Sequence, residues 1–284
     1  MQNADMKYIT PYVTAHTSGF LSVKNTGLGN VLFQIASIYG IAKRYGMRAV
    51  FPNVKVYCDI LFTRFHFLHR YTILRHLYSQ EDPIVPFPHH IYEKEHMNRT
   101  YDTEMIHTIQ TIKDNTMIHG YLESYSYFED SIEDIRRLFS VDDLSMHTIR
   151  HLYGNLLFST THTSVSIHFR GNEYLTVMNS PYDYDYYERA IQYMHQRVSS
   201  PHFLVFTDDP ASIDMTRLPS MTSYTFITSS YDYLDLWTMS LCAHHILCRS
   251  TFSWWGARLH PNGTPHVVYR KEDDCDMMKG FLGI

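Results

Sequence analysis

The chain lacks a long apolar segment. No run of about eighteen apolar residues occurs anywhere, and Asp5, Lys7 and His16 interrupt the stretch where a leader peptide would carry its apolar core. We therefore expect neither a signal peptide nor stable membrane insertion, and a cytoplasmic location.

Cysteine is also scarce, and no two cysteines have C-x-x-C spacing. The four are Cys58, Cys242, Cys248 and Cys275. Scattered thiols of this kind are typical of reduced, buried side chains, so neither a disulfide framework nor a zinc site is predicted. Nineteen histidines invite a metal interpretation, but pairs such as 89–90 and 244–245 are adjacent, and neighbours share no face of a helix or strand. We expect no metal site.

An excess of positive charge is absent as well. The net charge is −5 with histidine neutral, and Lys and Arg are dispersed along the chain. This distribution argues against nucleic acid as a partner, whereas a small phosphate-bearing ligand needs only a few local cations. The 44% apolar content is ample for the core of one large or two medium domains.

The first half begins with the pattern of a parallel α/β unit. A strand, a glycine-rich turn, a helix and a second strand are predicted at residues 20–24, 25–30, 31–45 and 48–51. Residues 53–115 are rich in aromatic residues and His and predict short helices and loops. A further strand and helix are predicted at 117–121 and 127–139.

The second half alternates apolar strand runs with helical segments. The strands are expected at 164–169, 203–207, 224–227, 245–248 and 266–269, and the helices at 184–198, 211–217, 232–243 and 253–259. This order predicts a doubly wound parallel sheet, which binds ligands beyond the carboxyl ends of its strands. We expect two domains, residues 1–158 and 159–284, with the boundary in a Ser/Thr-rich stretch.

Residues 168–174 lie where a buried strand runs into a loop. The planar guanidinium of Arg170 matches a phosphate, His168 supplies a hydrogen bond or a proton, and Gly171 lets the backbone approach a ligand closely. The alternative is a surface arginine and a structural histidine.

Asp208 and Asp209 also follow a predicted strand. Their carboxylates could accept hydrogen bonds from ribose hydroxyls or a guanine edge. Alternatively, one of them caps the next helix, with Pro210 in its first turn.

Residues 249–257 lie between a strand and a helix. Backbone N–H groups at a helix start bind anions, so Ser250, Thr251 and Ser253 could hold a diphosphate without a metal. The alternative is an ordinary Ser N-cap, and for Trp254 and Trp255 we favour a role as core anchors.

Two further stretches come from the first half. The turn that contains Gly29 and Asn30 precedes a helix, a common arrangement and by itself a weak signal. Residues 119–124 form another strand end, where Glu123 is either a group that reaches an acceptor hydroxyl or a solvated loop carboxylate.

In this order, the five stretches resemble the alpha-1,2-fucosyltransferases of glycosyltransferase family 11. The family patterns Gly-Leu-Gly-Asn-Gln-x-Phe-Gln, Gly-Tyr-x-Gln-Ser-x-x-Tyr-Phe, His-x-Arg-Arg-Gly-Asp-Tyr, Ser-Asp-Asp and Asn-Ser-Thr-Phe-Ser-Trp-Trp-Gly-Ala are similar to residues 27–34, 120–128, 168–174, 207–209 and 249–257. The last pattern is the most specific. The chain departs from the family at Val31, Glu123, Gly171, Asn172-Glu173 and Arg249, so it resembles a divergent member.

The resemblance implies a GT-B-like α/β fold of two Rossmann-type parallel-sheet domains facing a cleft. It further implies transfer of fucose from GDP-β-L-fucose to a glycan acceptor with inversion to an alpha linkage, and neither a cofactor nor a metal. Because no signal peptide or membrane anchor is predicted, we expect a soluble enzyme of bacterial or viral type. The donor-binding residues would be Gly29, Asn30, His168, Arg170, Asp208, Asp209, Arg249, Ser250, Thr251, Phe252 and Ser253.

The catalytic groups would be Arg170 and His168, together with Glu173 or Glu123 as the base. Arg249 becomes the candidate to replace the charge that is missing at Gly171. Three alternatives stay open: the same fold with another GDP-sugar, a non-catalytic nucleotide- or carbohydrate-binding homologue, and a His-rich metal hydrolase.

Overall fold

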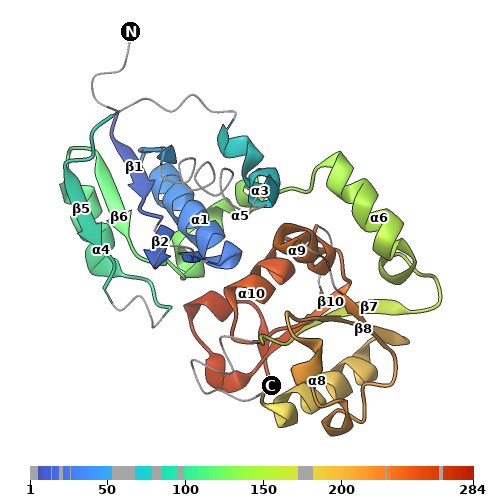
Figure 1. Cartoon of the computed structure of the whole chain (residues 1–284). Helices are drawn as coiled ribbons and strands as arrows, with labels where there is room; N and C mark the ends of the chain where they lie inside the picture. Colours follow the sequence, from blue (N-terminus) through green and yellow to red (C-terminus); the bar gives the residue numbers. More distant parts are fainter. Residues whose placement is uncertain are drawn as a thin grey trace. The chain divides into compact units, whose positions relative to one another are not determined.

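The computed structural model describes most of the chain (Figure 1). The described residues are 6–13, 15–18, 22–25, 27–52, 68–78, 85–94, 99–171, 182–227, 229, 231–261 and 265–284. The chain divides into two compact units: unit 1 contains Met1–Ser140 and Cys275–Lys279, and unit 2 contains Val141–Asp274 and Gly280–Ile284.

The division between the units precedes helix α6 (Asp143–Leu157) rather than following residue 158. α6 contacts strand β7 (Thr163–His168) and helix α9 (Asp232–Ser240), which both belong to unit 2. The short η6 turn (Asp276–Met278), near the end of the chain, is grouped instead with unit 1. There the Asp276 carboxylate accepts hydrogen bonds from Ser124 and Ser126.

Unit 1 contains a four-stranded parallel sheet in the order β4-β1-β6-β5. Its strands are β1 (Tyr8–Pro11), β4 (Arg48–Ala49), β5 (His89–Tyr92) and β6 (Thr116–His119). Helix α1 (Leu28–Arg44) contacts β1 and β4 and is buried along most of its length. A Cβ atom at Gly40 of α1 would collide with the backbone of Tyr127 and Phe128, so this position requires glycine.

The remaining helices of unit 1 are short. They are α3 (Leu68–Tyr78), α4 (Thr103–Thr111), η1 (Tyr125–Tyr127), η2 (Glu129–Ser131) and α5 (Ile132–Leu138). The helix predicted at 127–139 is therefore wrong in its first part, which consists of two 3-10 turns. The strand predicted at 117–121 is confirmed as β6.

The first predicted strand is also assigned to the wrong sheet. β3 (Ser22–Asn25) pairs antiparallel with β2 (Ala15–Ser18) in a separate two-stranded sheet. The strand that precedes α1 in the parallel sheet is β1, which pairs with β4 and β6. β1 is only four residues long and ends in Pro11, so its apolar pattern is too short to predict a strand.

Unit 2 contains a six-stranded parallel sheet in the order β12-β11-β10-β7-β8-β9. The strands that follow β7 are β8 (Pro201–Phe206), β9 (Tyr224–Ile227), β10 (His244–Ile246), β11 (Val267–Tyr269) and β12 (Leu282–Gly283). The five strands predicted for this half are confirmed. Both units are therefore parallel-sheet α/β domains, as the sequence predicts.

The helices of unit 2 supply most of its core. α8 (Tyr184–Arg197) packs Tyr186, Ile191 and Met194 against the apolar side chains of β7 and β8. α9 contacts α10 (Thr251–Arg258), and their three tryptophans at 237, 254 and 255 are buried. The helix predicted at 211–217 is wrong, because that segment contains only the 3-10 turns η3 (Pro210–Ser212) and η4 (Met215–Arg217).

Candidate active site

The order of strands in unit 2 reverses between β7 and β10. These two strands are hydrogen-bonded neighbours, with Ile246 in register with Ile167. The chain runs from β7 to β8 and β9 on one side of the sheet, and from β10 to β11 and β12 on the other. Doubly wound sheets bind ligands at such a reversal, beyond the carboxyl ends of the strands. His168 ends β7, and Cys248 and Arg249 follow β10.

His168 is a neutral hydrogen-bonding group. Its Nδ1 lies 3.2 Å from Sγ of Cys248, and its ring centroid lies 5.6 Å from that of Phe252. Burial, and to a lesser extent the charge of Arg170, lower the pKa of His168 to about 3. Burial also raises the pKa of the Cys248 thiol to about 11. When the thiol donates to Nδ1, the Nε2–H of His168 is left as a donor for a ligand.

Arg170 and Gly171 follow His168 at the same strand end. Arg170 is exposed, and its charge acts on both His168 and Cys248. The backbone N–H of Gly171 donates to Oδ1 of Asp208 over 3.0 Å. A Cβ atom at Gly171 would lie 2.6 Å from that oxygen, so a larger residue here would require the Asp208 side chain to move. Glu173, the first candidate base, lies outside the described residues.

The two aspartates do not cap a helix with their side chains. Asp208 is exposed and accepts from the Gly171 backbone. Asp209 is the N-cap residue of η3 but makes no side-chain cap hydrogen bond, and its own N–H donates to Thr207 Oγ1 over 3.2 Å. The position of Asp209 before Pro210 thus agrees with the capping interpretation, but its side chain makes no cap hydrogen bond, and ligand binding by either aspartate stays a prediction.

The turn at the start of α10 is held by its own hydroxyl groups. Ser250 is the N-cap residue and accepts from the Phe252 N–H over 3.2 Å. Ser253 is buried, and its hydroxyl donates to the carbonyls of Cys248 and Ser250. The two hydroxyls therefore shape the turn, and the part of it suited to an anion is the amino end of α10. The core-anchor interpretation of the two tryptophans is confirmed.

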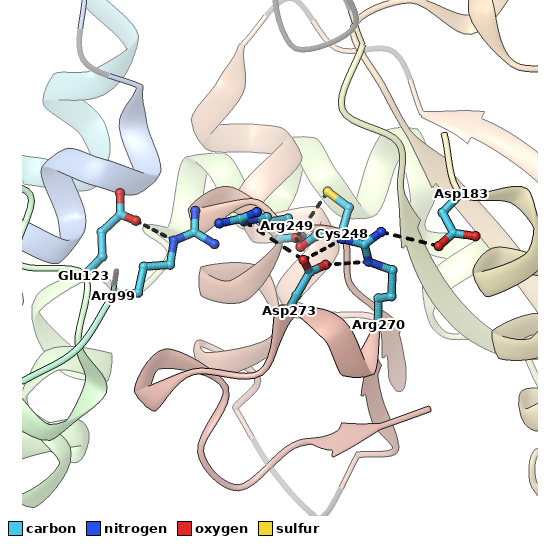
Figure 2. Close-up of polar contacts among 8 residues, drawn as sticks. Arg99, Glu123, Asp183, Cys248, Arg249, Arg270 and Asp273 are labelled. Atoms are coloured by element: carbon cyan, nitrogen blue, oxygen red, sulfur yellow. Dashed lines mark hydrogen bonds and ion pairs between the residues drawn. The ribbon is translucent and has the colours of Figure 1, made fainter. Parts of the chain in front are cut away.

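Two arginines share one carboxylate beside Cys248. Nη2 of Arg270 lies 2.8 Å from Oδ1 of Asp273, and Nε of Arg249 lies 4.0 Å from the same oxygen (Figure 2). Asp183, the N-cap residue of α8, lies 3.4 Å from Nη1 of Arg270. The Arg249 side chain is 53% exposed and Asp273 only 6%. The sequence analysis missed Arg270, although its place directly after a predicted strand is a signal that could have identified it.

The other predicted site residues belong to unit 1. Gly29 and Asn30 lie in the first turn of α1, which begins at Leu28 and not at the predicted residue 31. The carboxylate of Glu123 lies 2.8 Å from Nε of Arg99, and both side chains are largely buried (Figure 2). Glu123 is therefore not a solvated loop carboxylate. Its lone pairs are partly occupied by a guanidinium.

The described part of the chain holds neither a cluster of metal ligands nor a membrane-spanning helix. Among these residues, no group of three or more His, Cys, Asp or Glu side chains could hold a metal ion. None of the helices in the described ranges is long and apolar enough to cross a membrane.

Almost the whole length of the chain matches one protein family. The model of the family described as Glycosyl transferase family 11 matches residues 10–280. The chain belongs to this family.

The chain is similar to proteins from bacteria and mammals. The O-antigen biosynthesis glycosyltransferase WbnK of Escherichia coli is 24% identical over 82% of this chain and 88% of its own length. An alpha-1,2-colitosyltransferase of Escherichia coli is 26% identical over 52% of this chain and 53% of its own. The human galactoside alpha-(1,2)-fucosyltransferase 1 is 24% identical over 58% and 48%. The chain thus spans about half the length of the last two relatives.

Solved structures support the fold of this family-11 chain. The alpha-1,6-fucosyltransferase NodZ, in crystals soaked with GDP-fucose, superposes with a TM-score of 0.51 at 14% identity, over 90% of this chain and 93% of NodZ. A second NodZ structure, from Bradyrhizobium, gives 0.51 at 16% identity with the same coverage. The GT-B-like class expected from the sequence is confirmed.

Unit 1 of this family-11 chain also contains a cavity that the sequence analysis did not anticipate. It has a volume of about 260 Å³ and lies at the carboxyl ends of β1, β5 and β6. Its described lining includes Tyr12, Gln34, Tyr92, Glu93, His119 and Tyr121. Burial raises the pKa of Glu93 to about 7. Gln34 stands in the first family pattern, and Gly120 and Tyr121 begin the second, so these two patterns were the available signals for the cavity.

Proposed function

We propose that this chain is an inverting glycosyltransferase that moves L-fucose from GDP-β-L-fucose to a hydroxyl group of a glycan and forms an α-1,2 linkage. Family membership supports glycosyl transfer, and the names of several relatives support fucose as the sugar. The observation that carries the proposal is the cationic group at the strand reversal of unit 2. There, Arg170, the neutral His168 and the amino end of α10 follow neighbouring strands.

The donor diphosphate is assigned to this strand reversal. Arg170 pairs with phosphate oxygens through its planar guanidinium, and Nε2–H of His168 adds a neutral hydrogen bond. The amino end of α10 contributes the partial positive charge of its backbone N–H groups. Arg249 is exposed and only weakly paired with Asp273, so it can turn toward a phosphate at little cost.

The remaining donor contacts follow from the positions of polar groups. Asp208 and Asp209, at the end of the neighbouring strand β8, are assigned to the ribose or the guanine edge. Gly29 and Asn30, in the first turn of α1, are assigned to the donor through the family pattern that they belong to.

The reaction is a single displacement. An oxygen of the acceptor attacks the anomeric carbon of fucose, the bond from that carbon to the β-phosphate oxygen breaks, and its electron pair leaves with GDP. Negative charge grows on the departing diphosphate, where Arg170 and Arg249 stabilise it. Each fixed donor of this type lowers the activation barrier by on the order of 3 kcal/mol. The sequence points to Glu123 or Glu173 as the acceptor of the hydroxyl proton, but Glu123 is paired with Arg99 and Glu173 lies outside the described residues.

A second candidate function is transfer of a different sugar from GDP. One relative is, by its name, a colitosyltransferase, and this chain has Gly171 and Arg249 where the family pattern has Arg and Asn. These changes fall beside the proposed phosphate contacts, where they affect how the donor is held.

A donor screen separates the candidates. The enzyme is incubated with GDP-fucose, GDP-mannose and UDP-sugars in parallel, with a panel of galactosides, and products are read by mass and linkage analysis. We expect an addition of deoxyhexose mass at a 2-hydroxyl group from GDP-fucose only. Efficient transfer from another GDP-sugar alone would replace fucose in the proposal. Tight GDP binding without turnover on any acceptor would instead indicate a non-catalytic homologue.

A further inference from the structure

The cavity of unit 1 has one wall built from aromatic rings. Tyr92 stacks on His119 with ring centroids 4.4 Å apart at 20°, and the ring centroid of Tyr12 lies 4.5 Å from that of His119 in a tilted arrangement. Tyr92 is 66% exposed, although it is a large aromatic side chain. Exposed aromatic rings that gather at one concave site indicate a ligand that stacks on them.

Gln34 lines the same cavity, and its side-chain oxygen is unsatisfied. Its Nε2 donates to the carbonyl of Gly120 over 2.7 Å, which fixes the orientation of the amide. Its Oε1 is buried and has no hydrogen-bond partner within the described ranges, and the residue is 4% exposed. A buried acceptor without a partner costs about 1–3 kcal/mol. A hydroxyl donor from a bound ligand would remove that cost.

Glu93 is the acidic group of the cavity, and it is held by a strained turn. Its Oε2 accepts from the Leu122 N–H over 2.9 Å, and its Oε1 is 3.4 Å from the Tyr127 hydroxyl. Leu122 has a φ of 53°, a region that costs a branched residue on the order of 1–3 kcal/mol. A Cβ atom at Gly120 would come within 2.5 Å of Oε2. The backbone is thus folded tightly around this one carboxylate, whose Oε1 keeps spare accepting capacity.

The surroundings of Glu93 favour its protonated form. The titratable groups that act on it are Tyr127 of η1, Glu123 after β6, and Asp102 at the N-cap of α4. Glu123 is already paired with Arg99. His119 in the cavity wall has a pKa lowered by burial and by His90, so it does not supply a positive charge near neutral pH. Burial outweighs the two hydrogen bonds and brings the pKa of Glu93 to about 7. A general base works best when its pKa lies near the working pH.

We propose that this cavity binds one uncharged hexose ring of the acceptor, with Glu93 as the catalytic base that removes the proton from the attacking hydroxyl, a proposal that rests on the proposed function. The volume of about 260 Å³ lies just below the range of about 300–1,000 Å³ typical of small-molecule sites, which suits a single sugar ring. The described lining contains a carboxylate but neither Lys nor Arg. This composition disfavours an acidic sugar.

The proton transfer balances as follows. The O–H bond of the acceptor breaks and its proton goes to a carboxylate oxygen of Glu93. The acceptor oxygen forms the new bond to the anomeric carbon, while GDP leaves with the electron pair of the broken bond. Glu93 then releases its proton to solvent. Gln34 Oε1 accepts from a second hydroxyl of the same ring, and the aromatic wall stacks on its C–H face.

The decisive variant is Glu93→Gln, which keeps an acceptor for the Leu122 N–H. We expect kcat to fall by about 100-fold or more, because general base catalysis typically contributes at least about 100-fold to the rate. In wild type, kcat/KM for the acceptor should rise with pH to a plateau above about 7, and this rise should be absent from the variant. Glu104→Gln, which alters an exposed carboxylate paired with Lys94, is the matched control and should retain both activity and profile. A Glu93→Gln enzyme with near-normal kcat and an unchanged pH rise would overturn the assignment.

The binding role of the cavity is tested with methyl β-D-galactopyranoside as a probe, observed by saturation-transfer NMR. Tyr92→Ala should weaken the signal and raise the acceptor KM about tenfold, whereas Tyr224→Ala, at a similarly exposed tyrosine on β9, should change neither. Equal binding by wild type and Tyr92→Ala would contradict the aromatic wall. If Glu93→Gln proves unfolded by its melting temperature, Glu93→Asp takes its place, and must show a lower kcat with the pH rise retained.

Two failures are distinguishable. If wild type transfers no sugar from any GDP-sugar, the proposed function fails, and the base assignment fails with it. If wild type transfers fucose and Glu93→Gln does so equally well, the proposed function stands and only the base assignment fails. GDP affinity, measured by calorimetry, should be the same in wild type and Glu93→Gln, because Glu93 is not among the groups assigned to the donor and the diphosphate contacts belong to unit 2.

Discussion

Nδ1 of His168 and Sγ of Cys248 lie 3.2 Å apart, so the last residue of β7 is hydrogen-bonded to a thiol that follows β10. Both groups are neutral near pH 7, because burial lowers the pKa of the imidazole to about 3 and raises that of the thiol to about 11. The pair joins the two strands at the point where the strand order reverses. A neutral imidazole held in one tautomer is suited to donate to a phosphate oxygen without changing charge.

The first prediction concerns this hydrogen bond. Cys248→Ala should leave Nδ1 without its thiol partner and lower GDP affinity by several-fold, on the order of 1 kcal/mol, because the imidazole is no longer held in the donating tautomer. Cys248→Ser, which keeps a donor, should recover most of the affinity. Isothermal calorimetry of the three proteins checks this. Equal affinity for GDP in all three would show that the thiol has no part in donor binding.

The second prediction concerns stability at acid pH. The folded pKa of His168 is lowered from 6.5 to about 3, so the unfolded chain binds more protons between these values. Stability from the neutral imidazole is therefore fully present above about 6.5 and is lost as the pH falls through this window toward 3. Urea unfolding of wild type and His168→Asn at pH 4 and pH 7 measures the effect. Wild type should lose more stability than the variant on acidification, and an equal loss would contradict the burial of a neutral ring.

The third prediction separates the two arginines that share Asp273. Arg249 is half exposed and 4.0 Å from Asp273, so Arg249→Ala should change stability by less than about 1 kcal/mol. It should nevertheless weaken GDP binding about tenfold. Arg270→Ala should instead destabilise the fold by roughly 1–3 kcal/mol, because it leaves the buried Asp273 carboxylate without its close partner. Thermal unfolding and calorimetry on both variants check this contrast. The reverse pattern would exchange the roles of the two residues.

The fourth prediction concerns Glu93, whose contribution to stability changes with pH in the opposite direction to that of His168. The folded pKa of Glu93 is raised from 4.5 to about 7, so the folded protein binds more protons than the unfolded chain in this window. The free energy of unfolding of wild type should therefore fall, relative to Glu93→Gln, as the pH rises from about 4.5 to about 7. The difference reaches up to roughly 3 kcal/mol, since one pKa unit corresponds to about 1.4 kcal/mol. Parallel stability curves for the two proteins would mean that Glu93 is not buried as described.

Unit 2 was largely predictable from the sequence. Its strands are apolar runs that alternate with helices, and residues 203–207 and 224–227 predicted β8 and β9 closely. Periodicity and strand-end position are local properties, so one sequence suffices to predict them. The same logic correctly placed His168 and Arg170 at the end of a strand.

Other features depend on contacts between distant segments. β1 is too short to show a period and is stabilised by pairing with β4 and β6. Glu93 reads as an ordinary residue after a short strand. Its raised pKa arises from burial among segments that meet only in the fold, including the backbone at Leu122. The predicted helix at 211–217 failed because Pro210 and Asp214 each start a separate single turn.

The central claim is that fucose is transferred from GDP-fucose at a site where Arg170 binds the diphosphate. Its most direct test is the rate of sugar transfer from GDP-fucose to a galactoside by wild type, Arg170→Ala and the control Arg150→Ala. Arg150 belongs to α6, and its guanidinium lies over the ring of Phe158. The amount of glycosylated acceptor, by mass spectrometry, and the amount of released GDP are measured in the same reaction. We predict that wild type and control each produce equal amounts of GDP and deoxyhexosyl product. For Arg170→Ala we predict a transfer rate reduced by about 100-fold or more, at an unchanged melting temperature. Transfer by Arg170→Ala at the wild-type rate, or no transfer from GDP-fucose by wild type, would contradict the claim.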